Sequence, residues 1–541
     1  MEAAKKLLEL NKVSVGFPHR GGMRPVTENV SFSLHDGEIL GIVGESGSGK
    51  SVSMLAVMGL LSGNGKVMDG SIRFYNKEQP EEYTELNKLL KGELRQICGN
   101  EISMIFQEPM TSLNPVMTIG AQVEEMLTLH STLPREKHKE EVLSMLSEVG
   151  LSEVEKLYDK YPHQLSGGMR QRVMIAMAMI LRPKLLIADE PTTALDVTIQ
   201  AKILKLLKKL QTEYGTSIVL ISHDLGVIRS ICSRTVVMCE GRIVEQGKVE
   251  DIFERPQEEY TKRLLAAALG KGEIIEKREI DYQLAPVVKA ENYSVFYAEK
   301  PKNAQQLGST LAERLKSIFA GKIRREVVRG VSFEVYPGEI VGIVGESGCG
   351  KSTLIKGLAG LNPLTEGMLT MEAKHPQMVF QDPYGSLNPS KTIGWLLTEP
   401  LRLHSIGTKE EQRQQVLEML KKVGLSEEYY DRYPSTLSGG QRQRIAIAMA
   451  IMLKQKLILL DEPVSALDVT VQEQILILLL SLRKEYDLSY IFISHDMNVI
   501  HRICDRVMVM YHGEIVESGK TEEIFERPQH EYTRKLLKAR L

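Results

Sequence analysis

The sequence lacks any long apolar run, which limits how the chain can meet a membrane. Its longest uninterrupted apolar stretches, 173–181 and 445–453, have nine residues each, whereas a helix needs about twenty to cross a bilayer. The first ten residues, MEAAKKLLEL, also lack the apolar core and the small-residue cleavage site of an export signal. We therefore expect a protein that remains in the cytosol and does not itself cross the membrane.

Cysteine clusters and net charge are also missing. The five cysteines and twelve histidines form no CxxC or HxxxH pattern, which argues against a disulfide framework or a structural metal site. The 68 Lys and Arg residues nearly balance 70 Asp and Glu residues, so neither a basic nucleic-acid arm nor an acidic tail organises the chain. The 541 residues are 43% hydrophobic and 26% charged, which is typical of a soluble protein with several domains.

What the sequence does contain is a repeat of about half its own length. GIVGESGSGKS at 41–51 returns as GIVGESGCGKS at 342–352, and LSGGMRQR at 165–172 returns as LSGGQRQR at 437–444. DEPTTALDVT at 189–198 returns as DEPVSALDVT at 461–470, and the histidine of an ISHD segment follows 34 residues after the first Asp of each. We therefore predict two copies of one fold: a first domain at 1–265, a linker at 266–288 and a second domain at 289–541.

Each half has the pattern of an α/β domain. Short β-branched runs at 39–43, 185–188 and 217–221 predict buried strands, and helical periodicity follows them. The glycine-rich segment is expected at a strand-to-helix turn, the Asp-Glu pair at a strand end, and LSGG at the start of a helix that runs through Arg182. A segment at 298–326 occurs in the second half alone, and its leucine spacing and surplus of Lys and Arg favour a basic amphipathic helix. That helix would pack on its own domain or contact a membrane surface or partner.

The glycine-rich segments match the P-loop pattern G-x4-G-K-[ST]. In such a loop the glycines let backbone N–H groups surround phosphates, the Lys reaches the β- and γ-oxygens, and the hydroxyl holds Mg²⁺. The candidate ATP-binding residues are Gly44, Gly47, Gly49, Lys50, Ser51 and their repeats Gly345, Gly348, Gly350, Lys351, Ser352.

An acidic pair follows a predicted buried strand in each half. Asp189 and Asp461 stand where a carboxylate can hold Mg²⁺, and the adjacent Glu190 and Glu462 can polarise an attacking water. An isolated Asp-Glu pair is usually a solvated turn, but its position after an apolar strand and a P-loop favours catalysis.

Taken in order, these motifs resemble those of the ATP-binding cassette (ABC) ATPases, and the resemblance covers nearly all of both halves. It implies two P-loop NTPase domains in tandem, each with an α/β core, an antiparallel β subdomain and a helical signature subdomain. It also implies that two cassettes pair head to tail, so that each ATP is held by one P-loop and by the signature of the opposite cassette. The signature residues are Ser166, Gly167, Gly168 and, in the second half, Ser438, Gly439, Gly440, Gln441.

The resemblance assigns further residues to each site. Gln107 and Gln381 match the Gln-loop residue that contacts Mg²⁺ and water, and His223 and His495 match the switch histidine that senses the γ-phosphate. Phe17 and Tyr297 occupy the place of an aromatic that stacks on adenine, with core packing as an open alternative. Met169 replaces the usual Gln of the signature and Cys349 lies within the second P-loop; we expect small effects, because backbone groups carry the binding at both places.

Two classes of cassette protein fit a chain without a membrane span. One is the energy-coupling subunit of a bacterial importer, and the other is a soluble tandem cassette that acts in translation or on nucleic acid. The segments at 108–120 and 527–537 resemble the dipeptide, oligopeptide, nickel and glutathione importer group, and the join between the halves is short and charge-neutral. We therefore expect a peripheral protein on the cytoplasmic side of the cell membrane, with two multi-spanning permeases and an extracytoplasmic solute-binding protein as partners and no nucleic acid. ATP and Mg²⁺ are the expected cofactors, and no iron–sulfur cluster is expected because no Cys follows Cys504.

Overall fold

The computed structural model describes residues 5–19, 21–79, 81–107, 112–192, 197–268, 278–299, 323–346, 348–362, 364–373, 376–465 and 467–538. The chain forms two compact units that divide near residue 271. Residues 300–322, which make up most of the predicted basic helix, and residues 108–111 lie outside the described ranges. No helix within those ranges combines the length and apolar character of a membrane span.

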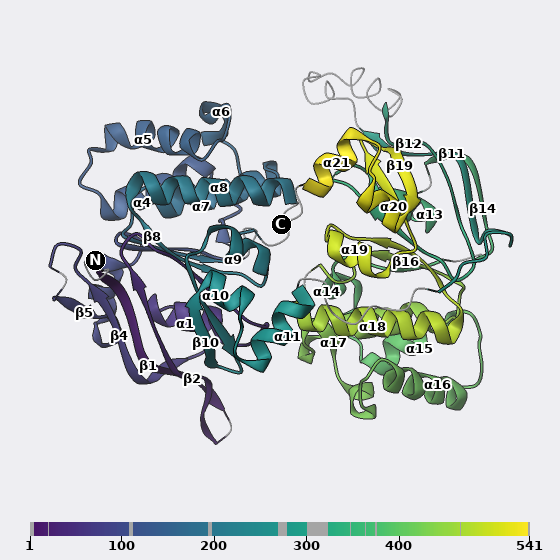
Figure 1. Cartoon of the computed structure of the whole chain (residues 1–541), viewed down its shortest axis with the longest axis horizontal. Helices are drawn as coiled ribbons and strands as arrows, with labels where there is room; N and C mark the ends of the chain where they lie inside the picture. Colours follow the sequence, from purple (N-terminus) through teal and green to yellow (C-terminus); the bar gives the residue numbers. More distant parts are fainter. Residues whose placement is uncertain are drawn as a thin grey trace, which may run out of the picture. The chain divides into compact units, whose positions relative to one another are not determined.

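The first unit contains two sheets (Figure 1). The antiparallel sheet has the order β2-β1-β4-β5, and the mixed sheet has the order β10-β9-β3-β8-β7-β6. In the mixed sheet all neighbours from β9 to β6 are parallel, and β10 is antiparallel to β9. The strands are β1 Lys6–His19, β2 Gly22–His35, β3 Ile39–Val43, β4 Lys66–Tyr75, β5 Tyr83–Glu85, β6 Ile102–Ile105, β7 Leu185–Asp189, β8 Ser217–Ile221, β9 Arg234–Cys239 and β10 Arg242–Lys248.

Helices of the first unit cover the mixed sheet and form a separate helical layer. In that layer α4, α5, α6 and α7 pack against one another. The helices are α1 Lys50–Val57, α2 Lys91–Ile97, α4 Ile119–His130, α5 Arg135–Glu148, α6 Val154–Tyr158, α7 Gly167–Met179, α8 Val197–Tyr214, α9 Leu225–Ile231, α10 Val249–Glu254 and α11 Glu259–Ala268.

The second unit repeats this plan with an antiparallel sheet β12-β11-β14 and a mixed sheet β15-β16-β17-β13-β18-β19. Its strands are β11 Val288–Glu299, β12 Ile323–Val335, β13 Ile340–Val344, β14 Thr365–Met371, β15 Gln377–Val379, β16 Leu457–Asp461, β17 Ser489–Ile493, β18 Arg506–Tyr511 and β19 Glu514–Lys520. Its helices are α13 Lys351–Leu358, α14 Pro383–Ser386, α15 Ile393–Leu403, α16 Lys409–Lys422, α17 Gly439–Ile451, α18 Val469–Tyr486, α19 Met497–Ile503, α20 Thr521–Glu526 and α21 Glu531–Lys538. The predicted α/β class with two tandem domains is confirmed.

The core of each unit lies on both faces of its mixed sheet. In the first unit Ile39 and Val43 of β3 belong to the apolar cluster shared with the helical layer. Leu40 and Ile42, which point the other way because side chains alternate along a strand, belong to the cluster shared with the antiparallel sheet and α1. All five residues of β3 are buried. The mixed sheet is therefore buried on both faces, and the P-loop, the Asp-Glu pair, Gln107 and His223 all lie at the carboxyl ends of its strands.

One element differs from the sequence prediction. The helix that begins at LSGG was predicted to run through Arg182, but α7 ends at Met179. Arg182 has a φ of 51° and its N–H donates to Met179 O over 2.8 Å, which closes the last turn. Pro183 follows, and a proline disfavours helical geometry in the residue before it.

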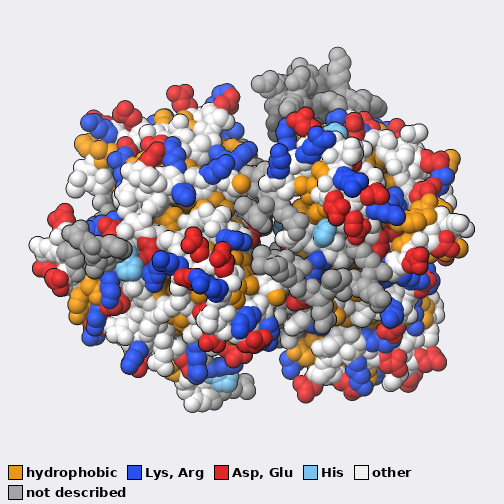
Figure 2. Space-filling view, viewed as in Figure 1, with side chains coloured by type: hydrophobic (Ala, Val, Ile, Leu, Met, Phe, Trp, Pro, Cys, Tyr) orange, Lys and Arg blue, Asp and Glu red, His pale blue; other side chains and the backbone are white. Residues whose placement is uncertain are grey.

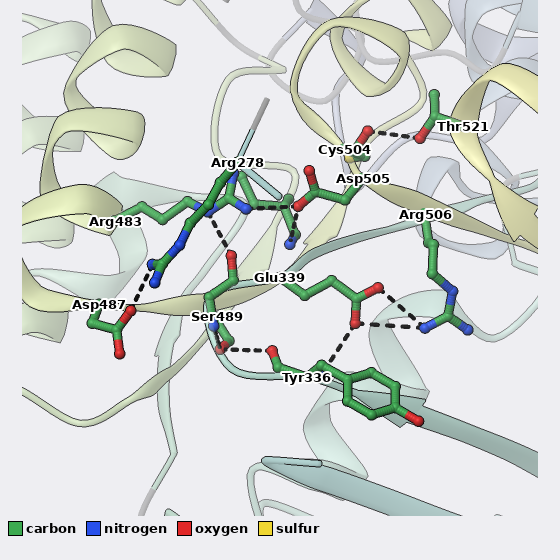
Figure 3. Close-up of polar contacts among 12 residues, drawn as sticks. Arg278, Tyr336, Glu339, Arg483, Asp487, Ser489, Cys504, Asp505, Arg506 and Thr521 are labelled. Carbon is green, nitrogen blue, oxygen red and sulfur yellow. Dashed lines mark hydrogen bonds and ion pairs between the residues drawn. The ribbon is translucent and has the colours of Figure 1, made fainter. Parts of the chain in front are cut away.

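Residues 278–287 belong to the second unit and lead into β11, and Figure 3 shows the contact that Arg278 makes. Arg278 Nη1 lies 2.6 Å from Asp487 Oδ1, and the Tyr282 ring contacts Tyr336 edge-on at 5.1 Å between centroids. Val287 N–H donates to Val335 O over 2.8 Å. These contacts fix the entry into β11, whose aromatic residue Tyr297 is a predicted site residue.

Candidate nucleotide-binding and active site

The first P-loop follows β3 and requires glycine at two places. Gly44 has a φ of 147°, and a Cβ there would lie 2.1 Å from Met238 O; Gly49 has a φ of 94°, and a Cβ there would lie 2.5 Å from Thr27 Cγ2. Gly47 also has a positive φ of 80°. The loop therefore turns tightly between β9 and β2 before α1 begins, with a curvature suited to surrounding an anion with backbone N–H groups.

Lys50 is held inside this loop. Its Nζ donates to Gly44 O and Glu45 O, each over 2.7 Å. Burial lowers the pKa of Lys50, and the nearby charges of Glu190 and Asp189 oppose that shift. The ammonium thus stands at the centre of the loop, where it can bind phosphate oxygens.

The end of β7 brings an acidic pair beside the P-loop. Ser51 Oγ donates to Asp189 Oδ1 over 3.0 Å, and burial raises the pKa of Asp189 to about 6 although the Ser51 hydrogen bond opposes this. The adjacent Glu190 accepts a hydrogen bond from Gln107 Nε2 over 2.9 Å, and His223 Nδ1 lies 3.2 Å from the same Oε2. Burial is the largest single effect on His223 and acts to lower its pKa, but the hydrogen bond to Glu190 and the charges of Glu190 and Asp224 together outweigh burial and raise the histidine pKa. Five predicted residues from four separate parts of the chain therefore converge.

The second unit builds the same arrangement. Lys351 Nζ donates to Gly345 O over 2.7 Å and to Glu346 O over 2.9 Å. The corresponding side-chain contacts are Ser352–Asp461 at 2.9 Å, Gln381–Glu462 at 2.9 Å and His495–Glu462 at 3.2 Å. Gly345, Gly348 and Gly350 all have positive φ. Neither unit lacks a predicted catalytic side chain.

In the second site, the contact between Glu462 and His495 shifts the pKa of both side chains. Burial acts to raise the pKa of Glu462, but the hydrogen bond and charge of His495 outweigh it, so the pKa of this carboxyl is lowered. The pKa of His495 is raised by the same contact against the effect of burial. The pair thus favours a charged carboxylate beside a protonated imidazole.

The Ser–Asp pairs suit Mg²⁺. Within the described ranges no group of three or more His, Cys, Asp or Glu residues could hold a metal ion. Ser51 with Asp189, and Ser352 with Asp461, each offer one hydroxyl and one carboxylate at hydrogen-bond distance. Mg²⁺ is commonly bound by one or two such oxygen ligands together with water and substrate phosphates.

Each signature sequence begins a helix of the helical layer. Ser166 caps α7 by accepting from Met169 N, and Ser438 caps α17 by accepting from Gln441 N. Gln441 Oε1 also accepts from Ser438 N over 3.0 Å and its Nε2 donates to Tyr429 OH over 2.9 Å. Met169 cannot make these bonds and packs against the core of the first unit. The Gly167-Gly168 and Gly439-Gly440 pairs occupy the first turn of α7 and α17 as predicted.

The two aromatic residues lie on the antiparallel sheets, Phe17 on β1 and Tyr297 on β11. Val15 of β1 pairs with Thr27, which borders Gly49, and Phe17 follows two residues later on the same side of the strand. Phe17 is half-buried and its ring lies against Gly65. Tyr297, the second aromatic, is 43% exposed. Tyr297 is thus the more exposed of the two, whereas Phe17 packs against the core of the first unit.

Sequence reasoning missed two tyrosines that reach the P-loops. Tyr260 of α11 accepts from Glu45 N over 3.2 Å, and Tyr532 of α21 accepts from Glu346 N over 2.8 Å. The repeat of ERPQEEYTKRLL at 254–265 as ERPQHEYTRKLL at 526–537 was the available signal.

Two protein families match the chain. The ABC transporter family matches residues 27–193 and 328–465. The family "Oligopeptide/dipeptide transporter, C-terminal region" matches residues 244–283 and 516–540. The second family therefore matches once in each half, and both matches include the end of the mixed sheet.

Individual relatives match over nearly the full length. The glutathione import ATP-binding protein GsiA of Salmonella choleraesuis (strain SC-B67) is 43% identical over 99% of this chain and 90% of its own length. The protein of the same name from Escherichia coli (strain K12) is 44% identical with the same coverage. A chain in the crystal structure of archaeal ribosomal stalk protein aP1 with archaeal ribosome recycling factor aABCE1 shares the fold, with a TM-score of 0.60, 20% identity and coverage of 94% and 90%. On these matches and on its two complete P-loop sites, the chain belongs to the ABC transporter ATP-binding proteins, which are ATPases, as a member with two cassettes.

Proposed function

We propose that this chain is the energy-coupling ATPase of a bacterial importer for peptides or a related small solute such as glutathione. The observation that carries the proposal is the 43% identity, over 99% of the chain, to proteins named for glutathione import. The matches to the oligopeptide/dipeptide transporter C-terminal region support the same solute class.

We assign binding of ATP to the two P-loops. The N–H groups of the loops at Gly44, Gly47 and Gly49 would surround the phosphates, and Lys50 would exchange its bonds to Gly44 O and Glu45 O for phosphate oxygens. In the second unit Lys351 would likewise exchange its bonds to Gly345 O and Glu346 O for phosphate oxygens. Phe17 and Tyr297 would stack on adenine.

Hydrolysis would use Glu190 and Glu462 as general bases. Gln107 and His223 hold the Glu190 carboxylate by two contacts to one oxygen, which fixes the position of the group that would accept a proton from the attacking water. His223 and His495 would sense the γ-phosphate. Mg²⁺, held by Ser51, Asp189 and Gln107 or by Ser352, Asp461 and Gln381, would supply charge neutralisation on the phosphates when bound.

We propose the pairing and the partners by analogy with the family. We propose that the cassettes, with bounds 1–265 and 289–541, pair head to tail within the chain. Ser438–Gln441 would then close on the ATP at Lys50, and Ser166–Met169 on the ATP at Lys351. The helix N-termini behind Ser166 and Ser438 offer N–H groups and a positive dipole end to a γ-phosphate. Two permeases and an extracytoplasmic solute-binding protein would complete the importer at the cytoplasmic side of the cell membrane.

No observation favours the alternative of a ribosome or nucleic-acid partner. The structural neighbour with a ribosomal role shares the fold alone. On the face shown in Figure 2, basic and acidic side chains are interspersed over the described surface of each unit. A protein that binds a phosphate backbone usually gathers Lys and Arg on one face.

The test is purification of the tagged chain from detergent-solubilised membranes, followed by identification of bound proteins and ATPase assay after reconstitution in lipid. We expect two multi-spanning proteins, and ATPase activity that rises when the solute-binding protein and a short peptide are added. Lys50→Ala with Lys351→Ala is the control and should lose the activity while keeping the partners. Recovery of ribosomes or RNA alone, in a salt-sensitive manner, would contradict the importer.

A further inference from the structure

The C-terminal helix of each unit reaches back to the P-loop of the same unit. Tyr260 lies near the start of α11 and Tyr532 near the start of α21, and each hydroxyl accepts a hydrogen bond from the backbone N–H of the residue that follows the first P-loop glycine. The chain separation is 215 residues in the first unit and 186 in the second. The contact is therefore long-range and occurs twice.

The residue held by the tyrosine is also the one that holds the P-loop lysine. Glu45 N–H donates to Tyr260, while Glu45 O accepts from Lys50 Nζ over 2.7 Å and from Ser48 N over 3.1 Å. Glu346 O likewise accepts from Lys351 Nζ and from Cys349 N. The peptide unit that donates to Tyr260 is Gly44–Glu45, and its Gly44 O also accepts from Lys50 Nζ over 2.7 Å. Rotation of this peptide would move the lysine contact, so the tyrosine bond fixes its orientation, and the Gly345–Glu346 peptide has the same two bonds.

Each tyrosine is itself firmly placed. A glutamate on the last strand of the mixed sheet accepts two backbone bonds from the turn before the helix: Glu245 from the N–H groups of 257 and 258, and Glu517 from those of 529 and 530. Tyr532 is 8% exposed, with its ring 4.2 Å from that of Tyr511 between centroids. Burial raises the pKa of both Tyr260 and Tyr532, so the hydroxyls remain neutral at physiological pH.

We propose that Tyr260 and Tyr532 are positioning residues that set the P-loop conformation and thereby the affinity of each site for ATP. The proposal rests on the assignment of the P-loops to ATP. It gives the C-terminal region of each cassette a direct connection to the nucleotide. Loss of the hydroxyl leaves a part-buried N–H without its acceptor and frees the peptide that carries the lysine contact.

The experiment separates the two sites within the full chain. Tyr260→Phe is made in a Lys351→Ala background, so that binding of trinitrophenyl-ATP reports the first site alone. We expect Kd to rise about fivefold, the effect of one net hydrogen bond. The converse pair, Tyr532→Phe with Lys50→Ala, should behave alike. In the otherwise unchanged chain, Tyr260→Phe with Tyr532→Phe should raise the KM for ATP more than it lowers kcat.

Tyr214→Phe is the matched control, because the Tyr214 hydroxyl donates to Glu148 in the same unit and away from the P-loop. It should lower Tm without changing Kd. If Tyr260→Phe did the same, its role would be structural and the proposal would be overturned. If trinitrophenyl-ATP still bound after Lys50→Ala was added to Lys351→Ala, the P-loop assignment itself would be wrong, and the role of Tyr260 would fall with it.

Discussion

Glu190 and Glu462 are each held by a glutamine and a histidine through one carboxylate oxygen. This geometry fits a general base that keeps its position while water enters. Substitution by glutamine keeps the shape and removes the ability to accept a proton. The Lys and Ser–Asp contacts do not involve the glutamate, so ATP binding should survive.

We therefore predict that Glu190→Gln and Glu462→Gln each slow hydrolysis at their own site by about 10²–10⁴-fold. ATP retained after rapid gel filtration, compared with phosphate released, measures the two effects separately. Gln107→Glu is a contrasting variant. It replaces the hydrogen-bond donor to Glu190 by a second carboxylate and leaves the general base Glu190 itself unchanged. If Glu462→Gln alone removed all hydrolysis and Glu190→Gln had no effect, the sites would be unequal, and the Met169 signature would be the first difference to examine.

A buried ion pair distinguishes the second unit from the first (Figure 3). Arg483 Nη2 lies 2.7 Å from Asp505 Oδ2, and both side chains are 6% exposed. Asp505 also accepts from Ile340 N, at the start of β13. At the equivalent positions the first unit has Gln211, which donates to Gly37 O, and Ser233, which donates to Ile39 O.

We predict that Asp505→Asn destabilises the second unit by about 3–5 kcal/mol, because it leaves the Arg483 charge buried and uncompensated. Arg483→Gln combined with Asp505→Ser copies the neutral pair of the first unit and should cost clearly less. Hydrogen exchange of β13 and β17, which lie beside the pair, reports the stability of this unit. Equal protection in Asp505→Asn and in the unmodified chain would show that the pair contributes little.

At the scale of elements, the backbone of the turn before each C-terminal helix donates hydrogen bonds to one carboxylate, Glu245 in the first unit and Glu517 in the second. Burial acts to raise the pKa of Glu245, but the surrounding interactions, led by the hydrogen bond from the backbone of Gln257, together outweigh burial and lower the pKa. Glu517 accepts the equivalent backbone bonds and its pKa is also lowered. A folded pKa below the unfolded value of 4.5 means that the stabilisation is present above about pH 4.5 and is lost as pH falls through the folded pKa.

We predict that Glu245→Ala with Glu517→Ala lowers Tm by a constant amount from pH 8 to about pH 5.5, and that the difference from the unmodified chain shrinks as pH falls further. Thermal melts across this range measure it. Glu250→Ala, which removes an acidic residue from the neighbouring helix α10, is the control and should show no such dependence. A difference that grew toward acid pH would reverse the sign and refute the assignment.

Local patterns predicted the elements that build the site, but not every contact between them. Strands at 39–43 and 217–221 were predicted with the observed bounds, because continuous β-branched runs between turn residues specify buried parallel strands. The end of α7 was missed, since its apolar run continues past Met179 and only Pro183 stops it. The Tyr260–Glu45 bond could not be derived, because an exposed-looking tyrosine in a polar helix carries no periodic signal for a partner 215 residues away. The repeat identified the residue without identifying its contact.

At the scale of the molecule, both units keep the same predicted site residues. The P-loop lysine, Ser–Asp pair, glutamate, glutamine and histidine have the same contacts in each. Fusion in one chain raises the effective concentration of each cassette for the other. These equal contacts give no structural reason for hydrolysis to occur at one site alone. The signature helices do differ, because α17 has a capping box through Gln441 that Met169 cannot supply to α7.

Head-to-tail pairing makes a prediction that no single unit could satisfy. Ser438→Arg places a bulky cation at the start of α17 and should impair hydrolysis at the site of Lys50, in the other half of the chain, while sparing the site of Lys351. Ser166→Arg is the matched control and should have the opposite pattern, because Ser166 starts the equivalent helix α7. Photolabelling with 8-azido-ATP under trapping conditions, followed by cleavage at a protease site introduced in the predicted linker 266–288, assigns nucleotide to each half. If Ser438→Arg left turnover at Lys50 unchanged and reduced it at Lys351, each signature would serve its own P-loop. Head-to-tail pairing would then be wrong, although both P-loops could still bind ATP.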